Sequence, residues 1–196
     1  MTPLTHPTPI LRFGAVALAL AAGLSLAACG GSSGSSTAAT TAVSPAGTQV
    51  LPVTADPIVN PATAPGLVID SVLVENNVDP ATGSDAADHL EIALTNTGTV
   101  ELSGLEVFYT FTDPTDDLTE SYYLALPTDF TIPAGSSRVV HFDGTGAPDH
   151  FPDNAYSLYH TSVNALDVEV VVSADGVAIQ TLTVQKDPGG AENPDE

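Results

Sequence analysis

Apolar residues recur at every second position in several short segments between residues 66 and 185, and this period most limits how the chain can fold. Leu90, Ile92 and Leu94 alternate with Glu91 and Ala93, and the segment 166–172 alternates more regularly still. Successive side chains of a β-strand point to opposite faces, so this period is typical of strands with one buried face. We find no helical period in this region, which excludes a helical bundle.

Clusters of Asn, Asp, Gly and Pro separate these segments. We predict a turn at Asn96-Thr97-Gly98, where Gly98 is free to take a positive φ, and a two-residue hairpin turn at Asp175-Gly176. Strands are expected at residues 67–75, 90–95, 105–112, 120–126, 130–132, 137–143, 166–172 and 177–184, with a strand or one helical turn at 156–160. The pattern predicts an all-β protein: a single immunoglobulin-like antiparallel β-sandwich of about seven to nine strands over residues 66–185.

One stretch of this region resembles a known kind of module. From Leu90 to Asp113 an alternating strand is followed by Asn96-Thr97-Gly98 and then by Leu102, Leu105, Val107 and Tyr109. This arrangement resembles the repeated immunoglobulin-like modules of bacterial and archaeal surface proteins, such as the CARDB-type adhesion-related domains. The resemblance covers about two strands and a turn, and it implies the sandwich fold rather than a particular activity.

The first 28 residues have the three parts of a secretory signal peptide. Arg12 precedes an apolar run from Phe13 to Ala28, which is shorter than the roughly 20 residues of a membrane-spanning helix. The run ends in Leu26-Ala27-Ala28-Cys29, which resembles the lipobox of bacterial lipoproteins. The resemblance implies transfer of diacylglycerol to the Cys29 sulfur and cleavage between Ala28 and Cys29. It also implies an extracytoplasmic protein held at the cell membrane by lipid.

The segments that flank the predicted sandwich have a different composition. Residues 29–65 consist mainly of Gly, Ser, Thr, Ala and Pro, and they predict a flexible linker behind the lipidated cysteine. Residues 186–196 predict a disordered acidic tail. Because Cys29 is the only cysteine, the sandwich has no disulfide.

The charge of the chain is strongly negative, with a formal net charge of −21 at pH 7. After residue 28 only Arg138 and Lys186 oppose the 24 acidic residues. This balance excludes nucleic acid as a partner, because phosphate binding needs clustered Lys and Arg. The expected partners are the membrane, through the lipid on Cys29, and an unknown protein or glycan.

Two groups of carboxylates suggest calcium as a possible cofactor. Calcium takes six to eight oxygen ligands, and acidic loops at the end of a sandwich can supply them. Aspartate is also an ordinary turn residue, so such groups arise by chance in an acidic chain. The candidate ligands are Asp113, Asp116, Asp117 and Glu120 in one loop, and Asp143, Asp149 and Asp153 in another.

Other chemistry has weaker support in the sequence. His141, His150 and His160, with His89, are candidate ligands for a transition metal, but their spacing matches no metal-binding motif. Ser, His and Asp are all present without a motif that would join them into a hydrolase site. We therefore expect no catalytic residues, and a secreted hydrolase is the last of our hypotheses.

Tyr122 and Tyr123 are adjacent in a predicted strand, so one of them should face outward and is a candidate for a binding surface. Cross-strand packing is the alternative explanation for that side chain. Taken together, the sequence predicts a lipid-anchored extracytoplasmic surface or binding module without catalytic activity. The alternative is a calcium-binding surface domain whose acidic loops order with the ion.

Overall fold

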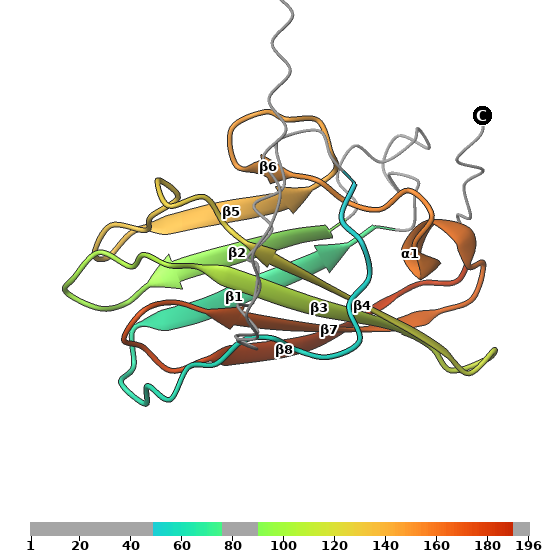
Figure 1. The fold of residues 1–196 in the computed structure, drawn as a ribbon, viewed down its shortest axis with the longest axis horizontal. Coiled ribbons are helices and arrows are strands. Elements are labelled where there is room, and N and C mark those ends of the chain that lie inside the picture. Colours follow the sequence, from blue (N-terminus) through green and yellow to red (C-terminus); the bar gives the residue numbers. More distant parts are fainter. Residues whose placement is uncertain (1–48, 76–89, 190–196) are drawn as a thin grey trace, which may run out of the picture. The chain divides into compact units, whose positions relative to one another are not determined.

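The structure is a computed structural model that describes residues 49–75 and 90–189 (Figure 1). These residues form two four-stranded sheets and one helical turn, α1 (Leu158–Thr161). The first sheet has the order β1 (Leu67–Val74), β2 (Leu90–Asn96), β5 (Ser137–Phe142), β6 (His150–Phe151). The second sheet has the order β4 (Leu118–Ala125), β3 (Glu106–Asp113), β7 (Leu166–Ser173), β8 (Gln180–Lys186). The prediction of an all-β sandwich with about eight strands is confirmed.

The order of the strands is that of an immunoglobulin-like sandwich. The first, second and fifth strands share one sheet, and the third, seventh and eighth share the other. Neighbouring strands are antiparallel except for β6, a two-residue strand that runs parallel to β5. No strand was predicted at β6, because two residues are too few to show a period.

The core lies between the two sheets and follows the alternating pattern. In β2 every second residue is buried, and Leu90, Ile92 and Leu94 face the core as predicted. Tyr109 of β3 packs against Tyr122 and Phe142, with ring centroids 5.3 Å and 5.1 Å apart. Since Phe142 lies in β5 of the first sheet, its contact with Tyr109 joins the two sheets, where antibody domains use a disulfide.

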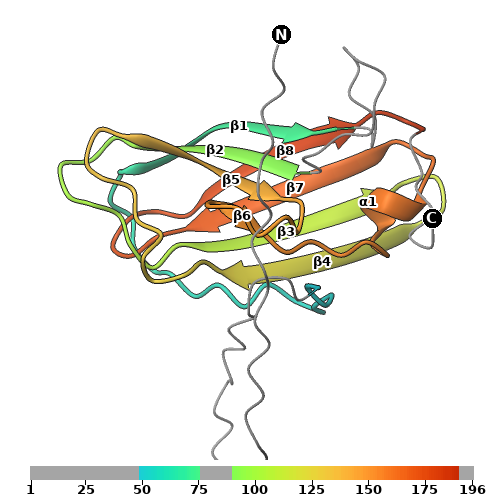
Figure 2. The ribbon, with the colours of Figure 1, turned by 90° about the horizontal axis from the view of Figure 1, so that it is seen from above.

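Residues 49–65, which we call the strap, lie against the sandwich. The prediction that the flexible linker extends to residue 65 is therefore wrong for residues 49–65. Val50 is only 6% exposed and belongs to the core. Its N–H donates to the carbonyl of Asp153 (3.1 Å), and the N–H of Val53 donates to the carbonyl of Ser121 in β4 (2.7 Å). In Figures 1 and 2 the strap, drawn in cyan, runs from the β4 edge across the outer side of the second sheet to β1.

One side chain fixes the far end of the strap. The Asn60 amide nitrogen lies 2.9–3.0 Å from Ser173 Oγ and from the carbonyls of Ala174 and Val177, at the end of the β7–β8 hairpin. A few residues on, the N–H of Ala178 donates to the carbonyl of Ala64 (2.8 Å). These contacts make the strap part of the folded domain. The sequence did not predict that the strap belongs to the domain, because an extended segment held by hydrogen bonds shows no apolar period.

We expect a chain that begins at residue 66 to melt about 5–10 °C below one that begins at residue 41. Burial of Val50 alone contributes about 1.5–3 kcal/mol, and removing Asn60 takes one donor from the carbonyls of Ala174 and Val177 in the β7–β8 hairpin. Thermal unfolding of the two chains measures the difference. Val50→Ser in the longer chain should reproduce part of the loss, and equal melting temperatures would show that the strap does not stabilise the domain.

The structure decides three local predictions. Gly98 closes its turn without a positive φ, and its N–H donates to Asn96 Oδ1 (2.9 Å). Asp175 and Gly176 form the predicted turn, since the Val177 N–H lies 3.5 Å from the Ala174 carbonyl and Gly176 has a φ of 74°, but β7 already ends at Ser173 and β8 begins only at Gln180. Lys186, predicted in the disordered tail, is the fully buried last residue of β8. Residues 190–196 lie outside the described residues.

Candidate functional site

A groove of about 820 Å³ lies between the segment 124–130, at the end of β4, and the segment 146–152, around β6. β4 and β6 are both edge strands, one in each sheet, so the groove lies on an open edge of the sandwich. Apolar side chains provide most of the lining: Leu124, Leu126, Pro127, Phe130, Pro148, Phe151 and Pro152. Such a volume and lining are usual for a site that binds a ligand or an extended peptide.

Arg138 of β5 holds the two walls of the groove in place. Its guanidinium carbon lies 3.8 Å from the centre of the Phe130 ring, and its Nη1 donates to the carbonyl of Thr131 (2.9 Å). The same guanidinium forms an ion pair with Asp149 on the opposite wall. Asp149 has a φ of 67°, an unusual backbone conformation for a residue other than glycine, and such conformations are concentrated at functional sites.

The outer edge of β4 presents backbone groups toward the groove. Leu126 N–H donates to Leu105 O on the β3 side (2.9 Å), whereas Ser121 O accepts from the strap on the other side. Backbone groups of alternate residues in an antiparallel strand point to the same edge. The N–H and C=O groups of Tyr123 and Ala125 therefore point away from β3, toward the open edge.

The calcium candidates in the first acidic loop have protein partners. Asp113 is fully buried, and it accepts hydrogen bonds from Ser162 Oγ (2.7 Å) and Asn164 Nδ2 (2.9 Å). These bonds are the main reason why the pKa of Asp113 is lowered from 3.8 to about 2. Asp113 therefore ties the end of β3 to the segment before β7.

The three other carboxylates of this loop lie on the β3–β4 hairpin. Asp117 is exposed in the turn with a φ of 54°, and Asp116 accepts a hydrogen bond from Asn164 (3.0 Å). Glu120 accepts from the Tyr122 hydroxyl (2.9 Å) and from the Leu158 N–H at the start of α1 (2.7 Å). Asp116 and Glu120 are thus hydrogen-bond acceptors for other parts of the protein, and this role accounts for their presence in the loop.

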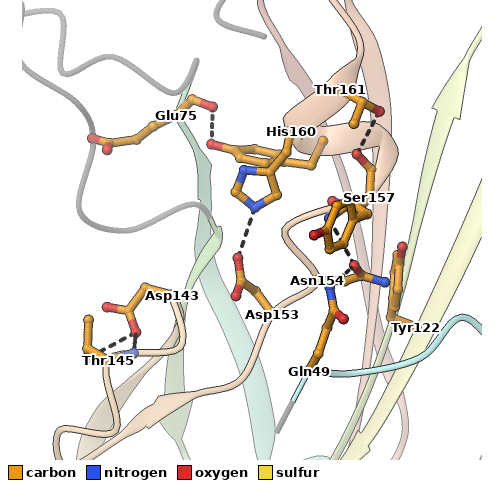
Figure 3. A network of polar contacts seen from close by, with 12 residues as sticks. Gln49, Glu75, Tyr122, Asp143, Thr145, Asp153, Asn154, Ser157, His160 and Thr161 are labelled. Atoms are coloured by element: carbon orange, nitrogen blue, oxygen red, sulfur yellow. Dashed lines mark hydrogen bonds and ion pairs between the residues drawn. The ribbon is translucent and has the colours of Figure 1, made fainter. Parts of the chain in front are cut away.

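The second acidic group is paired with histidines and with Arg138. Asp143 lies 2.6 Å from His150 Nδ1, Asp153 lies 2.9 Å from His160 Nε2, and Asp149 bonds Arg138. Figure 3 shows Asp153 and Asp143 pointing in different directions from their loop, with His160 above Asp153. Among the described residues no three His, Cys, Asp or Glu side chains are placed to hold one metal ion. Calcium binding stays a prediction of the sequence.

The histidines proposed for a transition metal are divided between two places. His141 and His150 are register partners on β5 and β6, and their rings stack with centroids 4.4 Å apart and planes 10° apart. His160 is separate, buried at α1 beside Asp153. His89 lies outside the described residues. Stacked rings direct their nitrogens along parallel planes, so this pair does not converge on one point.

A small cavity brings Ser157, His160 and Asp153 together, the residue types of a hydrolase triad. Its volume is about 10 Å³, which is room for about one water molecule. Core residues, among them Tyr109, Tyr122 and Tyr159, provide most of the rest of its lining. A cavity of this size does not admit a substrate, and we interpret these polar groups as the buried support of α1.

Of the two adjacent tyrosines, one faces outward as predicted, and it is Tyr123. Tyr122 is 1% exposed and belongs to the core, so it is not a surface residue. Tyr123 faces the outer side, half-buried, with its hydroxyl bonded to Glu106. Its neighbours on that side, Phe108 and Val171, are themselves buried. Tyr123 is thus a cross-strand packing residue, the alternative explanation given above.

Sequence reasoning missed the groove. Its walls come from two loops that are far apart in the sequence, and no period links them. A signal was present, because Pro127, Phe130, Pro148, Phe151 and Pro152 are apolar residues in segments that otherwise have the composition of loops.

In the described part of the chain, no helix has the length and apolar composition that a membrane span requires.

Comparison with known proteins adds little. No family model and no curated protein matches this chain. Among solved structures, the chain has some similarity to a Pseudomonas fluorescens alkylpurine DNA glycosylase AlkC bound to DNA containing an abasic site analog, with 16% sequence identity and a TM-score of 0.26. The match covers 50% of this chain and 25% of the glycosylase chain, so the present chain spans about a quarter of that protein. A TM-score this low carries no argument about function.

Proposed function

We propose that this protein is a lipid-anchored extracytoplasmic binding module, and that its binding site is the groove between residues 124–130 and 146–152. The observation that carries the proposal is the groove itself, a hollow of about 820 Å³ whose lining includes the core residues Leu124, Leu126, Phe130 and Phe151, each 4–9% exposed. Concave and mostly apolar hollows are where proteins usually bind ligands. The role is binding rather than catalysis.

The lipobox-like motif at Leu26-Ala27-Ala28-Cys29 supports the cellular placement. Two acyl chains at about 0.8 kcal/mol per buried CH₂ hold a protein to a membrane in effect permanently. The acidic sandwich is repelled by anionic lipid headgroups, so the domain stands away from the membrane on its linker. The groove then faces partners outside the cytoplasm.

Site-specific photo-cross-linking in living cells tests the proposal. A photoreactive residue at Thr128, on the groove wall, should give a discrete covalent adduct with an envelope component, whereas one at Thr181 on β8 should give none. Ala147→Trp, which fills the groove, should reduce the Thr128 adduct at least tenfold. The proposal fails when Thr128 gives no adduct, or when the adduct survives Ala147→Trp unchanged.

A further inference from the structure

We infer that the groove receives an extended polypeptide strand of a partner protein, which pairs with the outer edge of β4. The inference rests on the proposed function, since it takes the groove to be the binding site. It adds the kind of partner: a strand with apolar residues at alternate positions and basic residues between them. Strand addition to an exposed sheet edge is a recurring mode of peptide recognition.

The strap shows that this edge accepts a strand. Val53 forms an antiparallel bridge with Ser121, through the 2.7 Å bond from its N–H. Three residues before it, Val50 points between the sheets and is buried in the core, whereas Leu51 is 72% exposed. One segment of this chain thus already pairs with β4 and inserts an apolar side chain at the open edge.

The strap leaves the rest of the edge unused. Upstream of Val53 it bonds the carbonyl of Asp153 and the side chain of Asn154 rather than Tyr123 and Ala125. Among the described residues, no backbone hydrogen bond reaches Tyr123 or Ala125 on the side that faces away from β3. Unpaired N–H and C=O groups on an edge strand are a template for another strand. Ala125 lines the groove and Tyr123 is two residues before it, so a strand that pairs with this edge would lie along the groove.

The side chains around the edge define the incoming sequence. A residue opposite Leu124 on the added strand shares its face and points into the groove, toward Phe130 and Phe151. The residues of the added strand that alternate with it point outward. On that side Tyr123 is bonded to Glu106, and Asp129 lies at the groove rim. With a net charge of −21, the chain favours basic residues at these outward positions. A second copy of this acidic chain is disfavoured for the same reason.

Peptide binding to the chain 29–196, carrying Cys29→Ser, tests the inference. The probe is acetyl-Lys-Val-Lys-Val-Lys-Val-Lys-amide, and its control carries N-methyl groups on alternate residues, which keeps the charge but blocks one hydrogen-bonding edge. Isothermal titration calorimetry at 0.15 M salt should give an affinity at least tenfold higher for the unmodified peptide. Equal affinities would overturn strand pairing and leave only charge attraction.

A matched pair of variants locates the pairing. Ala125→Pro removes the outward N–H, and proline is tolerated where the N–H of an edge strand faces solvent. Ala125→Val has similar bulk and keeps the N–H. We expect at least a tenfold loss of peptide affinity for Ala125→Pro, little change for Ala125→Val, and similar circular dichroism for both. Equal loss in the two variants would overturn the role of the N–H.

Two further outcomes separate this inference from the proposed function. When Ala147→Trp removes the cellular cross-link and Ala125→Pro leaves it unchanged, the groove binds a partner but not by strand pairing. When deletion of residues 41–48 raises peptide affinity more than tenfold, the chain's own upstream segment occupies the edge and the inference is overturned.

Discussion

Replacement of Cys29 by alanine is expected to leave the protein without fatty acid and with residues 1–28 still attached. The sulfur is the expected acceptor of diacylglycerol, and cleavage before residue 29 depends on that modification in the lipobox-type pathway that the motif resembles. Two acyl chains represent on the order of 20 kcal/mol of membrane affinity. This substitution therefore has the largest effect that we expect from any single change.

Intact mass spectrometry of the protein from its native membrane measures this result. The wild-type product should begin at Cys29 and carry the mass of at least two acyl chains, and it should partition into a detergent phase. Ser33→Ala, four residues away, is the control and should be processed normally. An unmodified Cys29 in the wild-type product, or a product that begins elsewhere, would contradict the proposed anchoring.

Asp113→Ala is expected to lower the melting temperature by about 10 °C. The Asp113 carboxylate accepts from the N–H groups of Thr115 (2.9 Å) and Asp116 (3.2 Å), and from the side chains of Ser162 and Asn164. Removing it takes the acceptor from Ser162 Oγ and from the two backbone N–H groups, whereas Asn164 keeps its hydrogen bond to Asp116 (3.0 Å). Differential scanning calorimetry measures the change, and Asn164→Ala, which removes one donor only, should cost much less.

The charge of Asp113 has a second role, toward Lys186. Lys186 is fully buried at the end of β8, and its ammonium donates to the carbonyls of Ser162 (3.3 Å) and Gly189 (3.0 Å). Burial lowers the pKa of Lys186, and the negative charge of Asp113 opposes that shift. Asp113→Ala should therefore cost less in a Lys186→Met background than in the wild type. Equal costs in the two backgrounds would show that the two side chains are not coupled.

The pKa of Asp113 also gives a pH dependence. Because the folded pKa of about 2 lies below the usual 3.8, the stability that this carboxylate contributes is full above pH 3.8. It is lost as the pH falls from 3.8 toward 2. The difference in melting temperature between the wild type and Asp113→Ala should narrow over this interval, and a constant difference would contradict the lowered pKa.

Local patterns were enough to predict most strands. Leu90, Ile92 and Leu94 face the core because alternation is a property of the strand itself, and the same holds for the residues of β7. The number of strands and their spacing also predicted the immunoglobulin-like sandwich, whereas the strand order came from the structure. What failed were features with no period, such as β6 and the length of the β7–β8 connection.

The candidate site was the least predictable part. Asp113 and Tyr122 were singled out for calcium and for a surface, and the structure uses the first as a buried hydrogen-bond acceptor and the second as a core residue. Residue type alone did not reveal this. Whether a carboxylate accepts from Ser162 and Asn164, some fifty residues later, depends on which loops meet at one end of the sandwich.

The sequence by itself determined the class of the fold, the positions of most strands and the expectation of a lipid anchor at Cys29. Each of these depends on residues that are close in the sequence: the alternation of apolar residues, the turn residues and a four-residue motif. Only the tertiary structure decided that the strap belongs to the domain, that part of the β4 edge has no strand partner among the described residues, and that two distant loops enclose a groove. Those features depend on contacts between segments far apart in the chain, and such contacts leave no local period in the residues that make them.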